Sequence, residues 1–409
     1  MKFPHPILFL LFSHIFIHQP ILAAETLILT ENQIPARVRA QNPSLAAARL
    51  RIDDATARMM YAGRLDNPTL QITPRFNASS KENGIELNLS QKFPLTQRLG
   101  IEKKLTVLEL EAAKLEIKSA ENQLIGEAHT TAIQLLALQQ RRALLQQQKE
   151  AASAFADSLE IASKKGEASP LDALQAKLTA PRCDIEISIL NAQEQQHYAS
   201  IKQLLGMNIN QKLVIAGALE STSKSSTKVI SKHPELAVAE WKELGAKQNL
   251  SLELAKKTSD VSMGLVAGYE RNLDEPLGMQ NEGIIGFQFS IPLPLWNRNE
   301  AHIQSAAATS TRRQLETKAL QSKISLEAEA IQAEMTEWKK LLQQIDDTLI
   351  PQIATQTRLT EEAWQKGQVK LADLVRCREQ AYTIAMARLD ALQNYQLARV
   401  RFNTALGIN

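Results

Sequence analysis

The chain contains one pattern twice, and this repeat limits the folds open to it. Gly166 and Asp172 in the first half correspond to Gly367 and Asp373 in the second half, 201 residues later. Further pairs are Asn42-Pro43 with His233-Pro234, Phe93-Pro94-Leu95 with Leu293-Pro294-Leu295, and Leu204-Leu205-Gly206 with Ala405-Leu406-Gly407. Such self-similarity indicates the duplication of one structural unit. We expect a first repeat at 25–206, a linker at 207–232 and a second repeat at 233–409.

The first residues predict export from the cytoplasm. Lys2 is followed by the apolar runs 7–12 and 15–17 and by small residues at Ala23-Ala24. A charged start, an apolar run and a small-residue cleavage point are typical of a secretory signal peptide, which we place at 1–24. The apolar run is too short for a membrane anchor, because His14 interrupts it well before about 20 residues. We expect no other transmembrane helix, so membrane insertion would have to use strands.

The net charge argues against nucleic-acid binding, and the positions of the two cysteines argue against a disulfide. The full chain carries a net charge of +3, which lacks the strong basic field of a nucleic-acid-binding protein. The two cysteines, Cys183 and Cys377, lie at different distances from the paired Asp172 and Asp373. On two matching helices their depths would differ by roughly 10 Å, more than a disulfide spans. We therefore expect two buried, unpaired thiols.

Very long helices are predicted in both halves. The segment 101–165 contains no proline, and its apolar residues at Leu105, Leu108, Ala112 and Leu115 follow the spacing of a coiled coil. The second half matches this helix from 297 to 366, and only Pro351 is expected to kink it. Helices of this length predict an elongated molecule.

Shorter helices are expected beside each long one. Returning helices are predicted at about 170–206 and 371–406, after turns that begin at Gly166 and Gly367. Further short helices are predicted at about 44–64 and 235–257. Stacked end to end, the two short helices of a half match the length of its long helix. The joint between the short helices is expected to form an equatorial belt that contains 208–232, and the Ser- and Thr-rich run 221–227 in it is typical of a loop.

Four short segments alternate apolar and polar residues, as strands with two different faces do. They are 70–73, 84–90, 261–269 and 287–291, with Val266 as the exception to the alternation. Two interpretations remain at this point: strands that cross a bilayer, or half-buried strands of a soluble sheet. Two strands per half do not close a barrel, and lipid tolerates no open sheet edge. The membrane interpretation therefore requires several chains that share one barrel.

Enzymatic and metal-binding functions find no support in the sequence. It has no Gly-rich phosphate loop, no His-Glu-x-x-His motif and no Gly-x-Ser-x-Gly motif. Adjacent acids such as Asp346-Asp347 point away from each other on a helix. The histidines at 129, 197, 233 and 302 lack the short spacing of a metal site, and His233 at a repeat boundary is interpreted as structural. We expect no catalytic residue, no bound metal and no cofactor.

Two passages of the second half carry a family resemblance. They are Ile291-Pro292-Leu293-Pro294-Leu295-Trp296-Asn297-Arg298-Asn299, and Leu349-Ile350-Pro351 followed by Ala363-Trp364-Gln365-Lys366-Gly367, Asp373-Leu374 and Ala405-Leu406-Gly407. They resemble the TolC-like outer-membrane efflux proteins over essentially the whole mature chain. The Pro-Leu-Trp-Asn-Arg-Asn run is most similar to the heavy-metal branch, of the cobalt-zinc-cadmium type. The sequence departs from some relatives in lacking an acylated cysteine, and the first half has no counterpart of Pro351.

The resemblance implies a mainly α fold with a small β part. Long helices would form a periplasmic tunnel, and four strands per chain would contribute to a barrel shared by a homotrimer in the outer membrane. Such channels export metal ions or small toxic compounds together with a periplasmic adaptor and an inner-membrane pump of the RND type. The alternative is a secreted periplasmic coiled-coil scaffold whose strands form a small soluble sheet.

Site residues follow from this interpretation. The strand residues expected to line the lumen are Glu86, Asn88, Ser90, Gln288 and Ser290. Those expected to face lipid are Leu87, Leu89, Phe287, Phe289 and Ile291. The candidates for adaptor contact at the helical tips are Gly166, Glu167, Ser169, Pro170, Asp172, Gly367, Gln368, Lys370 and Asp373. An equally weighted interpretation of the tips is structural, because glycines cap helices and first-turn acids favour the helix dipole.

Overall fold

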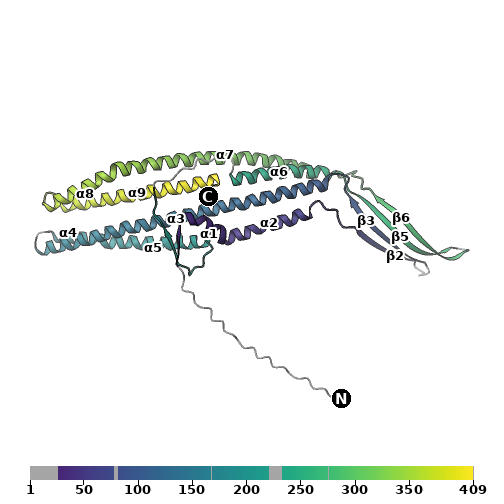
Figure 1. The fold of residues 1–409 in the computed structure, drawn as a ribbon, viewed down its shortest axis with the longest axis horizontal. Helices are drawn as coiled ribbons and strands as arrows, with labels where there is room; N and C mark the ends of the chain where they lie inside the picture. The colour runs from purple at the N-terminus through teal and green to yellow at the C-terminus, as the bar shows by residue number, and fades with distance from the viewer. Residues whose placement is uncertain (1–25, 78–81, 167, 221–232, 275, 409) are drawn as a thin grey trace, which may run out of the picture.

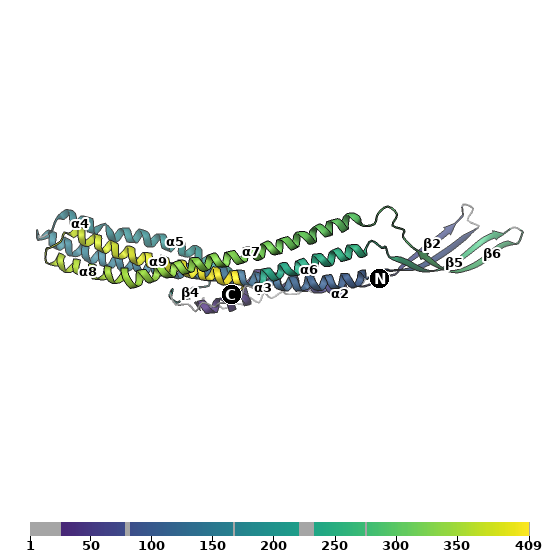
Figure 2. The ribbon, with the colours of Figure 1, turned by 90° about the horizontal axis from the view of Figure 1, so that it is seen from above.

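The chain forms a long rod of helices that ends in a narrow sheet (Figure 1). The computed structural model describes residues 26–77, 82–166, 168–220, 233–274 and 276–408. Seen from above, the helical hairpins occupy one end and the strands the other (Figure 2). The elongated shape predicted from the helix lengths is therefore confirmed, whereas the predicted signal peptide lies outside the described residues.

A long helix runs through each half. In the first half α3, Arg98–Lys164, has 67 residues, a length of about 100 Å. In the second half α7, Glu300–Gln344, continues through a π-helical turn, Ile345–Leu349, into α8, Ile350–Gln365. Because Pro351 has no N–H to donate to the preceding turn, the wider π-helical turn beside it accommodates the missing bond.

Shorter helices lie along the long ones. α2, Pro43–Tyr61, and α6, Pro234–Ala255, lead toward the strands, and α9, Leu371–Leu406, returns from the tip as predicted. The return helix of the first half is split into α4, Pro170–Lys177, and α5, Thr179–Leu204. The prediction that the helix after Pro43 reaches Arg64 is wrong, because the chain takes a left-handed conformation at Gly63.

The short helices meet end to end at one joint in each half. In the first half, the Nδ2 of Asn42 donates to the backbone oxygen of Leu204 at 2.8 Å. A Cβ at Gly206 would lie only 2.0 Å from the backbone oxygen of Gln41. In the second half, a Cβ at Gly407 would lie 2.2 Å from the ring of Pro234. Glycine is therefore required at both joints, which explains the repeated Leu-Gly ending of the two halves.

The segment predicted to form a belt at the joint of the short helices contributes a strand that was not predicted. β1, Leu27–Thr30, pairs in parallel with β4, Leu213–Ala216, and is followed by a 3-10 turn, Glu31–Gln33, and α1, Ile34–Gln41. β4 thus lies in the predicted belt segment 208–232. The Ser- and Thr-rich run 221–227, predicted to be a loop, lies outside the described residues. The boundaries proposed for the two repeats and their linker stay a prediction.

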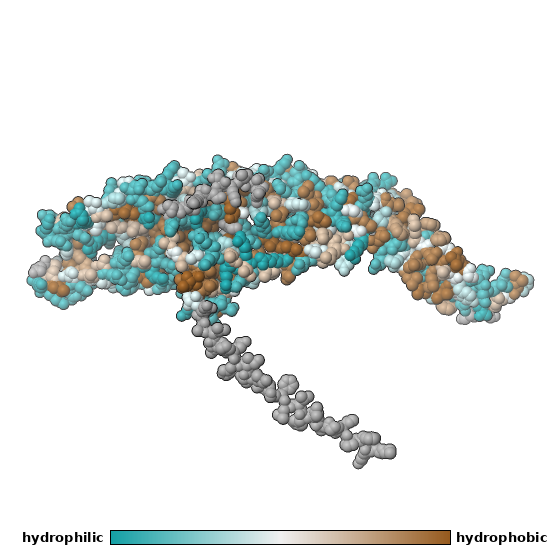
Figure 3. Space-filling model, viewed as in Figure 1, coloured by the Kyte–Doolittle hydropathy of each residue, from teal (hydrophilic) through white to brown (hydrophobic). Residues whose placement is uncertain are grey.

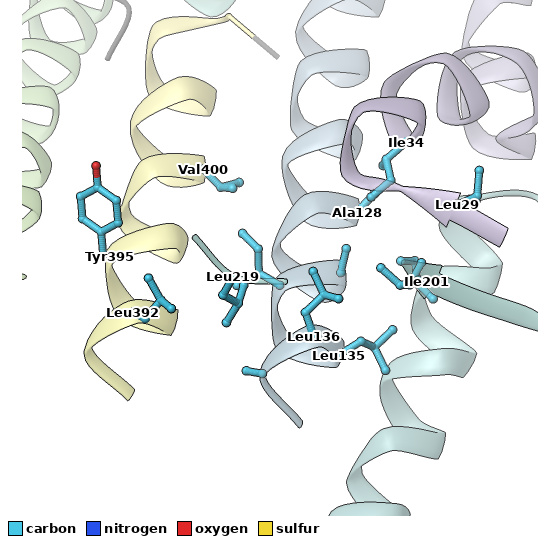
Figure 4. Packing of buried hydrophobic residues seen from close by; sticks show 14 of the residues in the cluster. Leu29, Ile34, Ala128, Leu135, Leu136, Ile201, Leu219, Leu392, Tyr395 and Val400 are labelled. Carbon is cyan, nitrogen blue, oxygen red and sulfur yellow. The ribbon is translucent and has the colours of Figure 1, made fainter. Parts of the chain in front are cut away.

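The main hydrophobic core lies beneath this belt. Side chains of β1, α1 and α5 pack on one side of α3, and side chains of α9 lie on its other side (Figure 4). Ile34, Ile125 and Ile201 are completely buried there. The belt therefore joins the first residues of the described chain to the centre of the long helices.

One antiparallel sheet forms the far end of the rod. Its order is β2-β3-β5-β6, with β2 Thr69–Phe76, β3 Asn83–Phe93, β5 Val261–Asp274 and β6 Gly278–Ser290. The prediction of two strands per half is confirmed. The prediction that Ile291 belongs to the last strand is wrong, because Pro292 and Pro294 have no N–H to extend the ladder and β6 ends at Ser290.

Candidate functional site: the two-faced sheet and the helical tips

The register of the sheet separates apolar from polar side chains. Leu89 of β3 lies opposite Leu265 of β5, which lies opposite Phe287 of β6. Since side chains alternate between the faces of a strand, the candidate residues divide as the sequence predicts. Leu87, Leu89, Phe287 and Phe289 share one face, and Glu86, Asn88, Ser90, Gln288 and Ser290 share the other.

The burial of the two faces is the reverse of that in a soluble sheet. Along β3 the leucines and isoleucine are exposed, whereas the polar residues between them are half-buried. β5 alternates in the same sense, with Leu265 exposed. The part of the chain that the structure describes places no helix over the apolar face. Figure 3 shows hydrophobic residues gathered over the half of the strand region next to the helices.

Polar side chains on the other face form bonds that cross strands. Arg75 of β2 pairs with Glu86 of β3 at 2.5 Å and with Glu270 of β5 at 3.0 Å. Asn88 of β3 donates its Nδ2 to the Oε1 of Gln288 on β6, and thus reaches across β5. This contact requires Gly264 on the intervening strand, since a Cβ there would lie 2.7 Å from the Oδ1 of Asn88. The repeat therefore places equivalent residues, 88 and 288, in direct contact.

The first helical tip is a capped turn. Gly166 takes a left-handed conformation with φ +78° after α3, and its Cβ position faces open space. The Ser169 hydroxyl accepts from the Leu171 N–H at 3.2 Å, Pro170 starts α4, and Asp172 lies in its first turn. Glu167, the remaining candidate of this tip, lies outside the described residues. These residues therefore have the capping role that the structural interpretation of the tips proposes.

The second tip has the same design. Gly367 has φ +70°, its N–H donates to the Trp364 oxygen at 2.9 Å, and the Gln368 N–H donates to the Ala363 oxygen at 2.9 Å. Lys370 precedes α9, and Asp373 in its first turn lies 3.8 Å from Arg376. Both tips lie together at the end of the rod far from the strands (Figure 1). The side chains of Gln368, Lys370 and Asp373 are exposed.

Side chains behind the turns hold the two tips against each other. Phe155 of α3 packs edge-on against Trp364 of α8, with ring centroids 5.4 Å apart, and Arg378 of α9 lies over the ring of Phe155. Glu160 of α3 connects α3 to α4 through its contact with Lys177. The hydrogen bonds that Lys177 and Lys164 donate to Glu160 lower the pKa of its carboxyl. The sequence alone did not indicate this cluster, because its members lie far apart in the chain.

An exposed apolar stripe along α4 and α5 was also missed. Its members are Leu171, Leu174, Leu178, Ile185 and Ile189, all well exposed. Their spacing of three, four, seven and four residues is close to a coiled-coil seam. That spacing was the available signal, but it does not reveal whether the seam is used within the chain or between chains. In the structure no other element of the described chain covers it.

The histidines and cysteines have structural surroundings. His233 caps α6, and burial lowers the pKa of its imidazole. Burial also lowers the pKa of His129, whose Nδ1 lies 3.9 Å from Glu31. Cys183 and Cys377 are buried and unpaired, as predicted, and burial raises the pKa of the Cys183 thiol. Among the described residues no group of three His, Cys, Asp or Glu side chains is arranged to hold a metal ion.

None of the helices in the described part of the chain is both long and apolar enough to span a membrane.

The chain is similar in sequence to known proteins. Residues 34–207 match the model of the family "Outer membrane efflux protein". The pyoverdine export outer membrane protein OpmQ of Pseudomonas putida is 21% identical over 314 residues, which cover 69% of this chain and 65% of OpmQ. The chain thus spans somewhat less than two thirds of the length of that relative.

Solved structures share the fold. The outer membrane protein VceC of Vibrio cholerae superposes with a TM-score of 0.76 at 16% identity, over 92% of this chain and 96% of VceC. CusC superposes with a TM-score of 0.78 at 15% identity, over 93% of this chain and 92% of CusC. Both superpositions are at less than 25% identity and therefore show a shared fold. The chain therefore has the fold shared by VceC and CusC, and its residues 34–207 match the outer membrane efflux protein family.

Proposed function

We propose that this chain is the outer-membrane subunit of a tripartite efflux system and forms a passive conduit across the outer membrane and periplasm. The observation that carries the proposal is the uncovered apolar face of the sheet, together with a polar face that is half-buried along β3 and β5. In water an apolar face of this size requires a protein cover, whereas in a bilayer lipid supplies it. The polar face then borders an aqueous lumen.

The open edges of the sheet support a shared barrel. β2 and β6 are the edge strands, and each leaves one row of backbone groups without a partner in the described chain. Lipid tolerates no open edge, so β6 of one copy would pair with β2 of the next. Three copies with four strands each would close a twelve-stranded barrel. The apolar stripe on α4 and α5 would pack against a neighbouring copy in the same homotrimer.

Within this barrel the two faces receive separate roles. Leu87, Leu89, Phe287 and Phe289 would face lipid, together with Ile291 just below the end of β6. Glu86, Asn88, Ser90, Gln288 and Ser290 would line the lumen. The chain would catalyse no reaction, because it would contribute only a water-filled path of fixed width. Control of opening would lie at the other end of the rod.

The tips are the proposed docking region for a periplasmic adaptor that links the channel to an inner-membrane pump of the RND type. Their exposed polar residues, among them Gln368, Lys370 and Asp373, are accessible at the end of the rod. The corresponding candidates of the first tip are Gly166, Ser169, Pro170 and Asp172, with Glu167 as an untested member. Capping and docking are compatible roles for the same turns.

The proposed cargo is metal ions or small toxic compounds. The similarity of the Pro-Leu-Trp-Asn-Arg-Asn run to the heavy-metal branch favours metal ions and a role in metal resistance. The name of OpmQ, a pyoverdine export protein, favours a larger organic cargo as the second candidate. Growth of a deletion strain on graded metal salts and on organic toxicants, with and without the chain, distinguishes the two.

The decisive experiment determines the assembly and its conductance. The full chain is extracted from outer membranes in mild detergent, weighed by size exclusion with light scattering, and inserted into planar bilayers. A detergent-requiring trimer with channel conductance is the expected result. A detergent-independent periplasmic monomer would overturn the conduit and support the coiled-coil scaffold. The trimer mass must be obtained without added partner proteins, so that it reports on the chain alone.

A further inference from the structure

The uncovered apolar face of the sheet carries one charged side chain among the described residues, Arg271 of β5. The β5 residues of 261–269 that lie on this face, and their partners on β3 and β6, are apolar or small, with Gln91 as the exception. Arg271 lies directly opposite two amides, Asn83 of β3 and Asn281 of β6. Near the β5–β6 hairpin the apolar face therefore gives way to a polar row.

The side chains of this row have no acidic partner in the part of the chain that the structure describes. On the opposite face Arg75 pairs with Glu86 and Glu270, whereas no described side chain forms an ion pair or hydrogen bond with the side chain of Arg271. Arg271 and the two asparagines beside it are exposed. Because directly opposed residues lie about 5 Å apart, one guanidinium and two amides can donate N–H groups to the same ligand. The row is therefore suited to an anion with several acceptor oxygens.

The height of the row corresponds to one boundary of a membrane. The stretch from Val261 to Arg271 spans about 33 Å along the strand. A strand tilt of about 35–45° reduces this to roughly 25 Å of height, which equals the apolar band of an outer-membrane barrel. Val261 follows Asp260, whose carboxylate pairs with Arg98 of α3 at 2.8 Å, so the boundary next to the helices lies there. Arg271 then lies at the boundary away from the helices.

The position of Arg271 in the sheet favours lipid over a second copy as the occupant of the row. β5 is an inner strand, flanked by β3 and β6, whereas copies that share a barrel would meet through the edge strands β2 and β6. An arginine that faces lipid is costly at the bilayer centre and tolerated near the headgroups. There its fork of N–H donors matches two oxygens of a phosphate. The occupant is therefore a lipid headgroup that carries phosphate.

We propose that Arg271, Asn83 and Asn281 form a binding site for a phosphorylated glycolipid of the lipid A type in the outer leaflet of the outer membrane. The guanidinium would bind two phosphate oxygens, and the two amides would donate to the remaining phosphate oxygen or to hydroxyls of the sugar. The outer leaflet is the one concerned, because the helices extend from the other end of the sheet into the periplasm. The proposal rests on the shared barrel of the proposed function.

Native mass spectrometry of the full chain in mild detergent tests the site, because one spectrum gives both the mass of the assembly and the number of bound lipids. The protein is titrated separately with bisphosphorylated lipid A, with the same lipid A after removal of its phosphates, with phosphatidylglycerol and with inorganic phosphate. Arg271→Gln removes the charge, and Arg271→Lys keeps the charge but loses the planar fork. The matched control is Lys92→Gln, which removes an exposed positive charge on the opposite face, at the other end of the sheet.

We expect the natural chain to bind phosphorylated lipid A about tenfold more tightly than the dephosphorylated form or phosphatidylglycerol, and not to bind inorganic phosphate alone. Arg271→Gln should abolish this preference, Arg271→Lys should reduce it to about threefold, and Lys92→Gln should leave it unchanged.

A trimer that does not prefer the phosphorylated glycolipid, or that keeps the full preference in Arg271→Gln, would overturn the site and leave the proposed function intact. Binding of inorganic phosphate alone would overturn the glycolipid as its ligand. A monomer would overturn the proposed function together with this inference.

Discussion

Asn42 and His233 occupy the same position of the two repeats and cap equivalent helices with different side chains. The Asn42 Oδ1 accepts from the Leu45 N–H at 2.9 Å at the start of α2. The His233 Nδ1 accepts from the Glu235 and Leu236 N–H groups at 3.2 and 3.4 Å at the start of α6. Only a neutral imidazole has a free lone pair to accept these bonds. The second repeat therefore contains a cap that depends on pH, and the first does not.

Acid should weaken the cap at His233. Burial lowers the pKa of His233 below its ordinary value of 6.5, although Glu235 and Glu327 act in the opposite direction. A depressed pKa in the folded state means that the contribution to stability is present above about pH 6.5 and is lost as pH falls through the folded pKa. We expect the free energy of unfolding of the natural chain to fall by about 1 kcal/mol from this cap. Thermal unfolding followed by circular dichroism between pH 7.5 and pH 5 measures it.

The chain itself offers the control for this experiment. His233→Asn copies the cap of the first repeat, so it should keep the stability at pH 7.5 and reduce its loss at low pH. His129 also has a lowered pKa and titrates in both proteins, so the difference between the natural chain and the variant isolates His233. Equal losses in the two proteins would show that the cap does not respond to pH.

Two glycines with similar backbone angles should tolerate alanine very differently. Gly166 and Gly206 have φ of +78° and +64°, which costs any other residue about 1 kcal/mol. At Gly166 the added Cβ meets open space, whereas at Gly206 it lies 2.0 Å from the Gln41 backbone oxygen. We expect Gly166→Ala to lower the free energy of unfolding by about 1 kcal/mol and Gly206→Ala by about 3 kcal/mol. Chemical denaturation measures both, and equal effects would mean that the joint between the short helices can open.

The sequence predicted the helices and strands well, because both depend on local periodicity. Leu371–Leu406 was placed at its observed ends, and all four strands of the sheet were found from their alternation. The belt strand Leu213–Ala216 was not found, because its four residues are all apolar and show no apolar–polar alternation. Its partner strand, Leu27–Thr30, is also 186 positions away in the chain. The Phe155–Trp364–Arg378 cluster could not be predicted for the same reason: tertiary packing selects its members. The division of the sheet faces followed from the two-residue period alone, but their reversed burial required the structure.

The apolar stripe on α4 and α5 predicts a contact between chains. Leu174 is exposed at its centre, and burying a leucine stabilises an assembly by about 2 kcal/mol. We expect Leu174→Asp to weaken the trimer, seen by light scattering in detergent as a shift toward smaller species at low protein concentration. Gln175→Asp adds the same charge at the adjacent exposed position and should leave the mass unchanged. If the Leu174→Asp protein remains fully trimeric on dilution, the stripe is not an interface.

Charge reversal at Asp373 separates the two roles proposed for the tips. Its carboxylate lies in the first turn of α9, where an acid stabilises a helix by about 0.5 kcal/mol. Asp373→Asn removes this stabilisation and Asp373→Lys reverses it, so both should lower the melting temperature slightly.

If the tip also binds an adaptor, Asp373→Lys should reduce the affinity for the co-purifying periplasmic adaptor by roughly tenfold, as expected for a lost and reversed charge contact. Glu379→Lys makes the same charge change at an exposed position six residues further along α9 and serves as the control. Biolayer interferometry with immobilised channel measures the affinity, and efflux in cells should decline in parallel. An affinity that is the same in Asp373→Lys, Glu379→Lys and the natural chain would leave Asp373 with its capping role alone.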